Sequence, residues 1–474
     1  MPMLTLYIGI HCNCYAMIEM QSYKNKILFY FLIILSGAGY YLLCYHTKRE
    51  NFYLVFGLFS CLFYAYFHLI RTFSFYYFRQ LVVMGILLRC LLLFSVPNLS
   101  DDVYRFIWDG RLTAIGINPF SHFPTEIMKM PVAPGITKEL FLQLNSPEYY
   151  TVYPPVLQTV FWCSAKLFPE NTFSAIVFLK CTIVLVEVGI YFTLVQILKR
   201  MSLSEHLSLL YMLNPLVIAE LTGNVHFEGV IILLILLAFL YILKNKLQVS
   251  AIFLGCAIAS KLVPLVFIPL FINEVGWKKG LVYFSVSGFI SLFLFALFFD
   301  FVTIQHLLKS VDLFFRHFEF NASIYYFVRS VGTLLSGYNL IAWIGPILSA
   351  TAILLILYFS FGNLKSQYRP FLSRALFAIT IWYLFSTTIH PWYICLPVAL
   401  TVFTPYRFAI IWSFTAILSY AAYQSDPVQE NMLLVSAGYI SMIVYGCWEL
   451  KNANKFRILS VNDQLQSFIS GRRS

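Results

Sequence analysis

Long hydrophobic runs separated by short polar or charged connections dominate this chain. Residues 26–45 (KILFYFLIILSGAGYYLLCY) and 229–243 (GVIILLILLAFLYIL) contain no charged residue except at their ends. A helix of about 20 apolar residues is needed to cross the hydrocarbon core of a bilayer, where no water satisfies the backbone. The pattern therefore predicts an all-α, polytopic integral membrane protein.

The hydrophobic runs predict about twelve or thirteen transmembrane helices in a single domain that covers residues 23–450. If Lys24 and Lys26 lie in the cytoplasm, the preference of basic residues for that side sets the direction of the later spans and places the basic tail, 451–474, inside. The expected spans are 27–45, 51–70, 80–97, 172–198, 206–222, 230–243, 249–272, 281–299, 339–361, 371–389, 392–404, 408–423 and 431–449.

Residues 153–168 form an apolar stretch that is short for a span and carries Lys166 near its end. Such a stretch suits a helix that lies at the membrane surface. The span 172–198 ends at two basic residues that favour the cytoplasm, so it must begin outside. We therefore expect 98–171 to be one external excursion that carries amphipathic helices.

Two further segments are irregular. Lys261 and Pro264 interrupt the apolar run 249–272, which either crosses once or forms two short half-helices. Residues 1–22 lack the basic start and the small-residue cleavage site of a signal peptide. We expect these residues to be disordered or to precede the true start, because Met20 opens a normal cytoplasmic lead into the first span.

Composition supports the membrane assignment: 60% of the residues are hydrophobic and the mean hydropathy is +0.77. The net charge of +11 does not indicate nucleic acid, because the basic residues lie mainly in short connections and in the tail, where they set topology and contact anionic lipid heads. Most of the ten cysteines lie inside apolar runs and behave as small hydrophobic residues.

Charged and ionisable residues gather on the predicted outer face, although only 11% of the chain is charged. The stretch 98–120, NLSDDVYRFIWDGRLTAIGINPF, opens the external excursion with two adjacent aspartates. The gathering favours chemistry at the membrane surface. Its members are Asp101, Asp102, Asp109, Glu126, Glu139 and Glu148 in the excursion, and His226, Glu228, Arg316, His317, Glu319 and His390 in the other outer turns.

The aspartate pair has two interpretations. Ser100 could cap a helix whose first turn favours acids, and Asp101, Arg105 and Asp109 are spaced to pair along one helix face. Alternatively, one carboxylate is a general base for a hydroxyl, or the two together hold a divalent cation. The residues alone leave these alternatives open.

Several motifs together resemble the GT-C superfamily of membrane glycosyltransferases, and among them bacterial mannosyltransferase-like proteins that use polyprenyl-phosphate sugars. The resemblance covers residues 80 to about 405, and two N-terminal spans that precede the aspartate loop set this chain apart. Besides the aspartate pair, the motifs are YPPVLQ (153–158), NPLVIAELTGNVHFEG (214–229), SKLVPLVFIPLF (260–271), FNASIYYFVR (320–329) and HPWYICLPV (390–398).

The resemblance implies transfer of a hexosyl unit, with mannose expected, from a polyprenyl-phosphate donor to a hydroxyl of a glycan, lipid or protein. The reaction would take place on the periplasmic side of a bacterial inner membrane. Asp101 corresponds to the general base, and Asp102 would support it or hold a metal; no cofactor is implied with certainty, and a divalent cation stays open.

The resemblance also suggests substrate-binding residues. A phosphate at the membrane surface needs cations around it. Each cation also has a purely structural alternative, such as snorkelling to a lipid head. Where related oligosaccharyltransferases carry an acidic metal motif, this chain reads NVHFE, which departs from it. The candidates are Arg105, Lys261, Arg316, Arg329 and His390 for the donor phosphate, His226 and Glu228 for the acceptor, and Tyr153 as a further substrate-binding residue.

A transporter or flippase for a lipid-linked or anionic solute is the alternative from another class. Transporters place ionisable residues on broken helices near the midplane and often show paired halves. The segment 249–272 fits the first feature, but the sequence shows no long internal repeat and its charges gather at the surface. A sugar ligase or polymerase would need a large external loop late in the chain, and none is expected here.

Overall fold

The computed structural model describes residues 25–131, 135–298, 301–361 and 371–452. The described residues form helices and no β-strand apart from one isolated bridge between Phe320 and Thr388. The all-α prediction is therefore confirmed. The expectations for residues 1–22, and for the tail beyond residue 452, fall outside the described residues.

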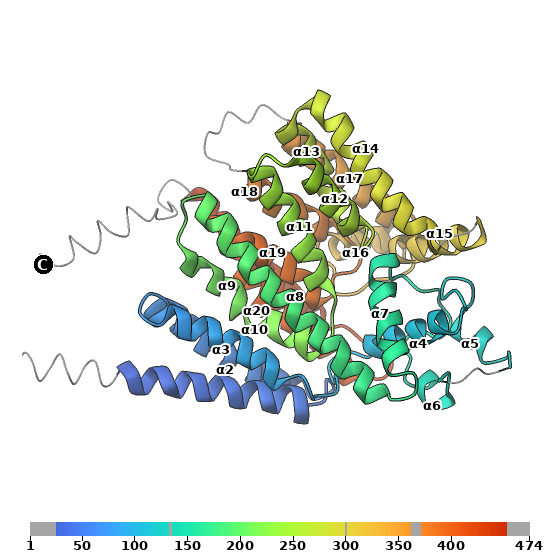
Figure 1. Cartoon of the computed structure of the whole chain (residues 1–474), viewed down its shortest axis with the longest axis horizontal. Coiled ribbons are helices and arrows are strands. Elements are labelled where there is room, and N and C mark those ends of the chain that lie inside the picture. Colours follow the sequence, from blue (N-terminus) through green and yellow to red (C-terminus); the bar gives the residue numbers. More distant parts are fainter. Residues whose placement is uncertain (1–24, 132–134, 299–300, 362–370, 453–474) are drawn as a thin grey trace, which may run out of the picture.

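The first two expected spans form where the sequence predicted them, whereas the third, 80–97, is an α-helix only as far as Leu91. A helix covers Asn25–His46 and ends in the π-helical turn η1 (Leu42–His46); α2 (Phe52–His68) continues into η2 (Leu69–Phe73). The third is α3 (Phe78–Leu91). These helices, in blue, lie side by side along one edge of the molecule (Figure 1). In a continuous apolar run, a helix satisfies its own backbone hydrogen bonds while its apolar side chains face the lipid.

The predicted external excursion contains four helices: α4 (Asp102–Ala114), α5 (Pro124–Ile127), α6 (Lys138–Phe141) and α7 (Pro155–Leu167). α4 and α7 pack closely, because Gly110 lies directly against the Phe161 backbone. A Cβ at Gly110 would be 2.2 Å from the Phe161 carbonyl oxygen, so no larger residue fits there without movement. This contact places the start of α4 beside the polypeptide that enters α7.

The next expected spans are one long helix followed by a broken one. α8 covers Thr172–Arg200, and then short pieces follow: η3 (Glu205–Ser208), α9 (Leu209–Met212), α10 (Pro215–Val217) and η4 (Ile218–Gly223). Asn214 caps a new start at Pro215, which has no backbone N–H to continue the previous helix. The axis then turns by 116° into α11 (Glu228–Leu243), and residues 224–227 lie at the bend.

The ambiguous run 249–272 is divided into two short helical parts. α12 (Leu247–Ile258) stops before Lys261, and η5 (Val263–Phe267) with α13 (Ile268–Val275) follows. α14 (Trp277–Ala296) and α15 (Phe301–Arg316) come next. Lys261 thus lies in a break between helices, as the half-helix alternative requires.

The C-terminal part continues the bundle with long and short helices. The expected spans 392–404 and 408–423 each form as a short 3₁₀ helix joined to a short α-helix. In order, the elements are α16 (Ile324–Ser336), α17 (Ile341–Phe361), α18 (Phe371–Phe385), η6 (Pro391–Ile394), α19 (Cys395–Thr401), α20 (Phe408–Thr415), η7 (Ala416–Gln424) and α21 (Met432–Lys451).

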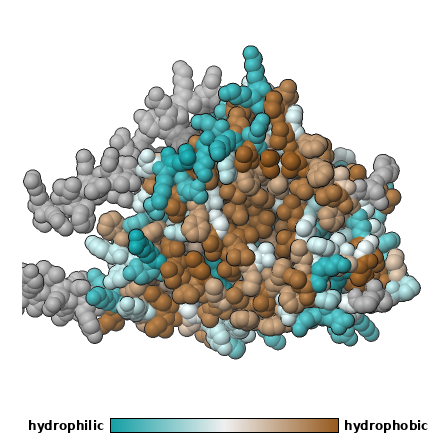
Figure 2. Space-filling model, in the orientation of Figure 1, coloured by the Kyte–Doolittle hydropathy of each residue, from teal (hydrophilic) through white to brown (hydrophobic). Residues whose placement is uncertain are grey.

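By length and composition, six helices of the described chain can cross a membrane, or seven if the bent pair at Gly223 counts as one span. Five shorter apolar helices accompany them. The face in Figure 2 is hydrophobic over its middle, with hydrophilic groups along its upper left edge and at its lower right, near α5 and α6. Large apolar side chains such as Leu185, Leu281 and Leu354 are exposed, as a lipid-facing surface requires.

Candidate active site

The aspartate pair stands at the first turn of α4, and Asp101 is not a simple helix cap. Its side chain makes no capping hydrogen bond. Instead, Asp101 Oδ2 lies 2.6 Å from Arg49 Nη1, while Asp101 Oδ1 has no hydrogen-bond partner among the described residues. The side chain is 33% exposed. One carboxylate oxygen is therefore anchored, and the other is free to meet a substrate.

Arg49 comes from the connection between the first helix and α2, which sequence reasoning did not assign to the site. Its guanidinium lies over the Tyr423 ring, 5.0 Å from the centroid. Asn98 holds the same connection by donating its Nδ2 to the carbonyls of Leu43 and Thr47. The sequence carried one signal: a basic residue on the side that basic residues avoid, where a nearby acid explains it.

Asp102 faces the interior of the site. Asn145 Nδ2 donates to Asp102 Oδ1 at 2.8 Å, and the Tyr153 hydroxyl donates to Asp102 Oδ2 at 3.3 Å. Burial, with the adjacent Asp102 charge, raises the pKa of Tyr153, so its hydroxyl keeps its proton as a donor. The Tyr153 ring packs edge-on against Phe106. The structure thus places Tyr153 beside the acid pair.

His226 reaches the same carboxylate from the bend before α11. His226 Nε2 lies 3.8 Å from Asp102 Oδ2, and His226 Nδ1 lies 3.0 Å from the backbone oxygen of Glu220. The imidazole stacks on Trp392 at a centroid distance of 3.7 Å, and Trp392 stacks in turn on His390 at 4.4 Å. Glu220 and Trp392 are site residues that the sequence analysis did not single out.

Lys261 and Glu228 form the second acid–base pair of the site. Lys261 Nζ donates to Glu228 Oε1 at 2.6 Å and lies 3.7 Å from the centroid of the Tyr393 ring. Burial alone would lower the pKa of Lys261, but Glu228 and Tyr393 outweigh it and the pKa is raised. Lys261 therefore stays a cation, and its side chain is 28% exposed.

His390 contributes a neutral imidazole. Burial lowers its pKa to about 3, and the nearby His226 and Lys261 add to the effect. Its ring also stacks on Phe320, next to the bridge between Phe320 and Thr388. The structure thus brings together seven of the ten residues that the sequence nominated. They are Asp101, Asp102, Tyr153, His226, Glu228, Lys261 and His390.

The three predicted arginines lie in other contacts. Arg105 Nε donates to Asp109 at 2.8 Å, and its Nη1 donates to the carbonyls of Ser146 and Tyr149. This pair realises the i, i+4 alternative and ties α4 to the loop that carries Asn145. Arg329 Nη1 donates to Glu319 at 2.6 Å.

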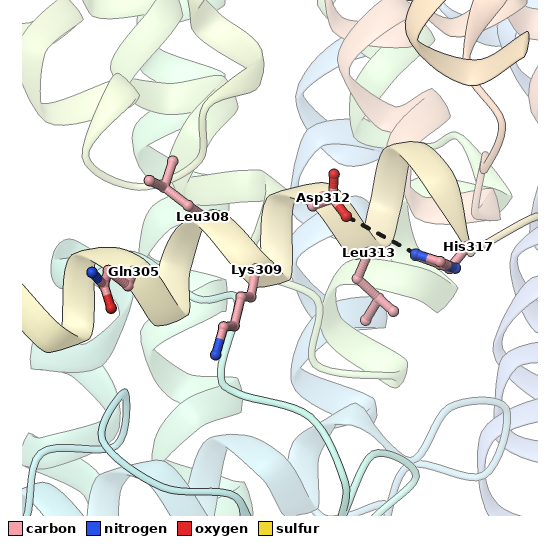
Figure 3. A pocket seen from close by; sticks show the side chains of 6 residues that line it. All are labelled: Gln305, Leu308, Lys309, Asp312, Leu313 and His317. Atoms are coloured by element: carbon pink, nitrogen blue, oxygen red, sulfur yellow. Dashed lines mark ion pairs between the residues drawn. The ribbon is translucent and has the colours of Figure 1, made fainter. Parts of the chain in front are cut away.

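Arg316 lies on α15, where its Nε is 3.0 Å from Asp312. The same Asp312 pairs with His317 beside a wide surface hollow of about 650 Å³ (Figure 3). The hollow is lined by Gln305, Leu308, Lys309, Asp312, Leu313 and His317. These residues all come from α15 and the turn after it, so this hollow is separate from the acid pair.

A metal has no ready cage in the described part of the chain. No group of three or more His, Cys, Asp or Glu side chains is arranged there to hold an ion. Three of the four carboxylate oxygens of the pair are engaged, since Arg49 binds Asp101 Oδ2, Asn145 donates to Asp102 Oδ1 and Tyr153 donates to Asp102 Oδ2. The arrangement can accept a proton at the open oxygen of Asp101 and bind an anion at Lys261.

Residues 40–275 match the family model described as alpha-(1->6)-mannopyranosyltransferase, N-terminal domain. The matched segment contains most of the cluster, from Arg49 to Lys261, while His390 and Trp392 lie beyond it. No curated protein matches the chain. The all-helical membrane fold and this match place residues 40–275 in the alpha-(1->6)-mannopyranosyltransferase family.

Proposed function

We propose that the protein transfers a mannosyl unit from a polyprenyl-phosphate mannose to an acceptor hydroxyl on the external face of the membrane. Family membership supports mannosyl transfer, and the site supports the rest. The observation that carries the proposal is the state of Asp101, whose Oδ2 is anchored by Arg49 while its Oδ1 is open. A fixed carboxylate with one free oxygen is what a general base needs.

In this proposal Asp101 takes the proton of the acceptor hydroxyl as the acceptor oxygen bonds to C1 of mannose. The bond between C1 and the phosphate oxygen breaks, and its electron pair leaves with the polyprenyl phosphate. The protein has to place the hydroxyl, hold the sugar and stabilise the leaving phosphate. Asp102, with donors on both of its oxygens, is a fixed second carboxylate beside the reacting sugar.

Lys261 is the first choice for the phosphate. It lies in the break between α12 and η5, keeps its charge and is partly exposed. A phosphate that arrives from the bilayer on a long lipid would meet it without crossing the protein. Glu228 now holds the ammonium and would be displaced or would share it, since an ammonium has three donors. His390, being neutral, can add one hydrogen bond.

The remaining predicted residues fit less directly. Arg105, Arg316 and Arg329 already have carboxylate partners, so the proposal does not need them at the phosphate. Glu228 stays a candidate for the acceptor. His226 is almost fully buried, so we expect it to act through Asp102 rather than to touch the acceptor.

The test is a transfer assay with the full chain in membranes or detergent. Radiolabelled polyprenyl-phosphate mannose is compared with polyprenyl-phosphate glucose and with a nucleotide mannose, each with and without chelator. We expect product from the first donor, unchanged by the chelator. Product only from the nucleotide sugar would overturn the donor assignment. Lipid movement between leaflets without any glycosidic product would favour the transporter alternative.

A further inference from the structure

A buried chain of polar groups lies behind the aspartate pair and plays no part in the chemistry described so far. It runs from Glu220, on η4, through His226 to Asp102. Glu220 and His226 are both almost entirely buried, so we expect neither side chain to contact a substrate directly. What they can change is the state of the Asp102 carboxylate.

The contacts of His226 fix where its protons are. Nδ1 faces two acceptors, the Glu220 backbone oxygen at 3.0 Å and Glu220 Oε2 at 3.3 Å, so Nδ1 carries a hydrogen. Nε2 is buried without a hydrogen-bond partner in the described chain, and it points at Asp102 Oδ2. In a neutral imidazole, the lone pair on Nε2 would face the negatively charged carboxylate, which is repulsive. A protonated imidazole makes the same contact attractive.

The Glu220 carboxylate needs a counter-charge, and His226 is the one at hand. Tyr420 donates its hydroxyl to Glu220 Oε1, and Asn224 donates to Oε2 at 3.3 Å. These partners are neutral. Among the described residues, His226 is the only basic group that pairs with Glu220. Burying a carboxylate is costly unless it is paired, which favours an imidazolium here.

The backbone holds the imidazole in this position at a cost. Val225 has φ +62°, a left-handed conformation that a β-branched residue rarely adopts. The amide of His226 donates to the carbonyls of Glu220 and Leu221 in the same turn. Trp392 covers the ring. Strain of this kind is found where surrounding structure maintains a functional geometry.

We propose that Glu220 is a positioning residue that holds His226 as an imidazolium facing Asp102, so that the Asp102 carboxylate is fixed beside the reacting sugar. This inference rests on the proposed function. Each carboxylate of the pair then has its own cation, Arg49 for Asp101 and His226 for Asp102. Without the imidazolium, Asp102 would keep only its neutral donors, Asn145 and Tyr153.

The charge state of His226 depends on all the groups that surround it. Glu220 on η4, Asp102 on α4 and Glu228 on α11 favour the charged ring, and burial opposes it. On the other side of Trp392, His390 is neutral, and Lys261 is a cation paired with Glu228. Removal of the Glu220 charge should therefore make the imidazolium lose its proton at lower pH.

The experiment compares the pH dependence of kcat for wild type, Glu220→Gln and His226→Gln, all purified full-length and assayed with polyprenyl-phosphate mannose. Glu220→Gln should lower kcat by about tenfold to a hundredfold, part of what a general base supplies, and should move the alkaline limb to lower pH with the donor KM nearly unchanged. A double variant that combines Glu220→Gln with His226→Gln should have a kcat no lower than that of His226→Gln alone, because Glu220 acts through His226.

Glu187→Gln is the matched control. Glu187 is another buried carboxylate, paired with Arg89 at 2.6 Å and bound by the Tyr211 hydroxyl at 2.7 Å, so it has partners of its own outside the chain from Glu220 to Asp102. Its loss should lower thermal stability and leave the alkaline limb in place. If Glu220→Gln behaves like Glu187→Gln, Glu220 is only structural and the inference is overturned.

Nitrogen-15 NMR of wild type labelled at histidine gives a readout that needs neither turnover nor a stable Glu220 variant. The His226 signal, assigned by its loss in His226→Gln, should show both ring nitrogens protonated at neutral pH. A neutral ring would overturn the inference. Absence of mannosyl transfer by wild type would instead refute the proposed function, so the two failures are distinguishable.

Discussion

The guanidinium of Arg49 lies 2.6 Å from the carboxylate of Asp101, so the first helical hairpin completes the acid pair at the start of α4. The two residues are 52 positions apart, with Arg49 between the first two helices and Asp101 at the start of α4. Arg49 is also held against Tyr423, from the far end of the chain. The N-terminal helices are therefore part of the candidate site as well as part of the membrane anchor.

Replacing Arg49 by Met should reduce mannosyl transfer by about tenfold or more, because Asp101 loses the contact that orients its base oxygen. Arg49→Lys should retain part of the activity, since the charge stays although the fork geometry is lost. The control is Lys48→Met, which removes a neighbouring exposed charge that has no described partner. Equal kcat in Arg49→Met and Lys48→Met would remove Arg49 from the site.

Asp101→Asn should reduce kcat by about 10²–10⁴, the usual contribution of a general base, with normal insertion into the membrane. Glu148→Gln removes an exposed carboxylate from the same loop and should retain wild-type turnover. Activity of Asp101→Asn within a few-fold of wild type would refute its role as the base. Loss of activity in Asp102→Asn alone would transfer the role to its neighbour.

These two variants test features that the sequence revealed unequally. The aspartates were identifiable because they open a polar loop directly after an apolar run. Arg49 was visible only as a basic residue on the wrong side, because no sequence pattern links it to position 101. Glu220 was missed for a related reason: it sits in an apolar stretch, and its partner Tyr420 is 200 residues away.

The same limit applies to the fold. Continuous runs such as 27–45 gave helices where they were expected, because their only stable state in lipid is a helix. The expected span 206–222 was broken instead at Asn214–Pro215, and Pro391 lies between two expected spans. His226 enters the site at the bend after Gly223, and Trp392 enters it directly after Pro391. Local pattern identifies which segments are apolar, while tertiary packing decides which of them bend.

Lys261→Met should raise the donor KM, and Lys261→Arg should restore part of the affinity because the charge is kept. Because the pKa of Lys261 is raised above its ordinary value, the cation is present throughout the range below it. Deprotonation of Lys261 should therefore not weaken the donor affinity of the wild type between about pH 7 and pH 9. Titration of the donor at several pH values checks both points. An unchanged donor KM in Lys261→Met would mean that Lys261 only forms a structural ion pair with Glu228.

The external position of the loop can be tested on both sides of α7. If Pro155–Leu167 lies on the membrane surface, positions 148 and 170 are on the same side, whereas a helix that crosses would separate them. Both residues are exposed glutamates, so cysteine at either position should be tolerated. In a cysteine-free background, an impermeant thiol reagent added outside should label both variants. Lys199 and Arg200 at the end of α8 favour this result, because they belong in the cytoplasm. Labelling at only one position would mean that α7 crosses. Residues 98–171 would then not form one external excursion.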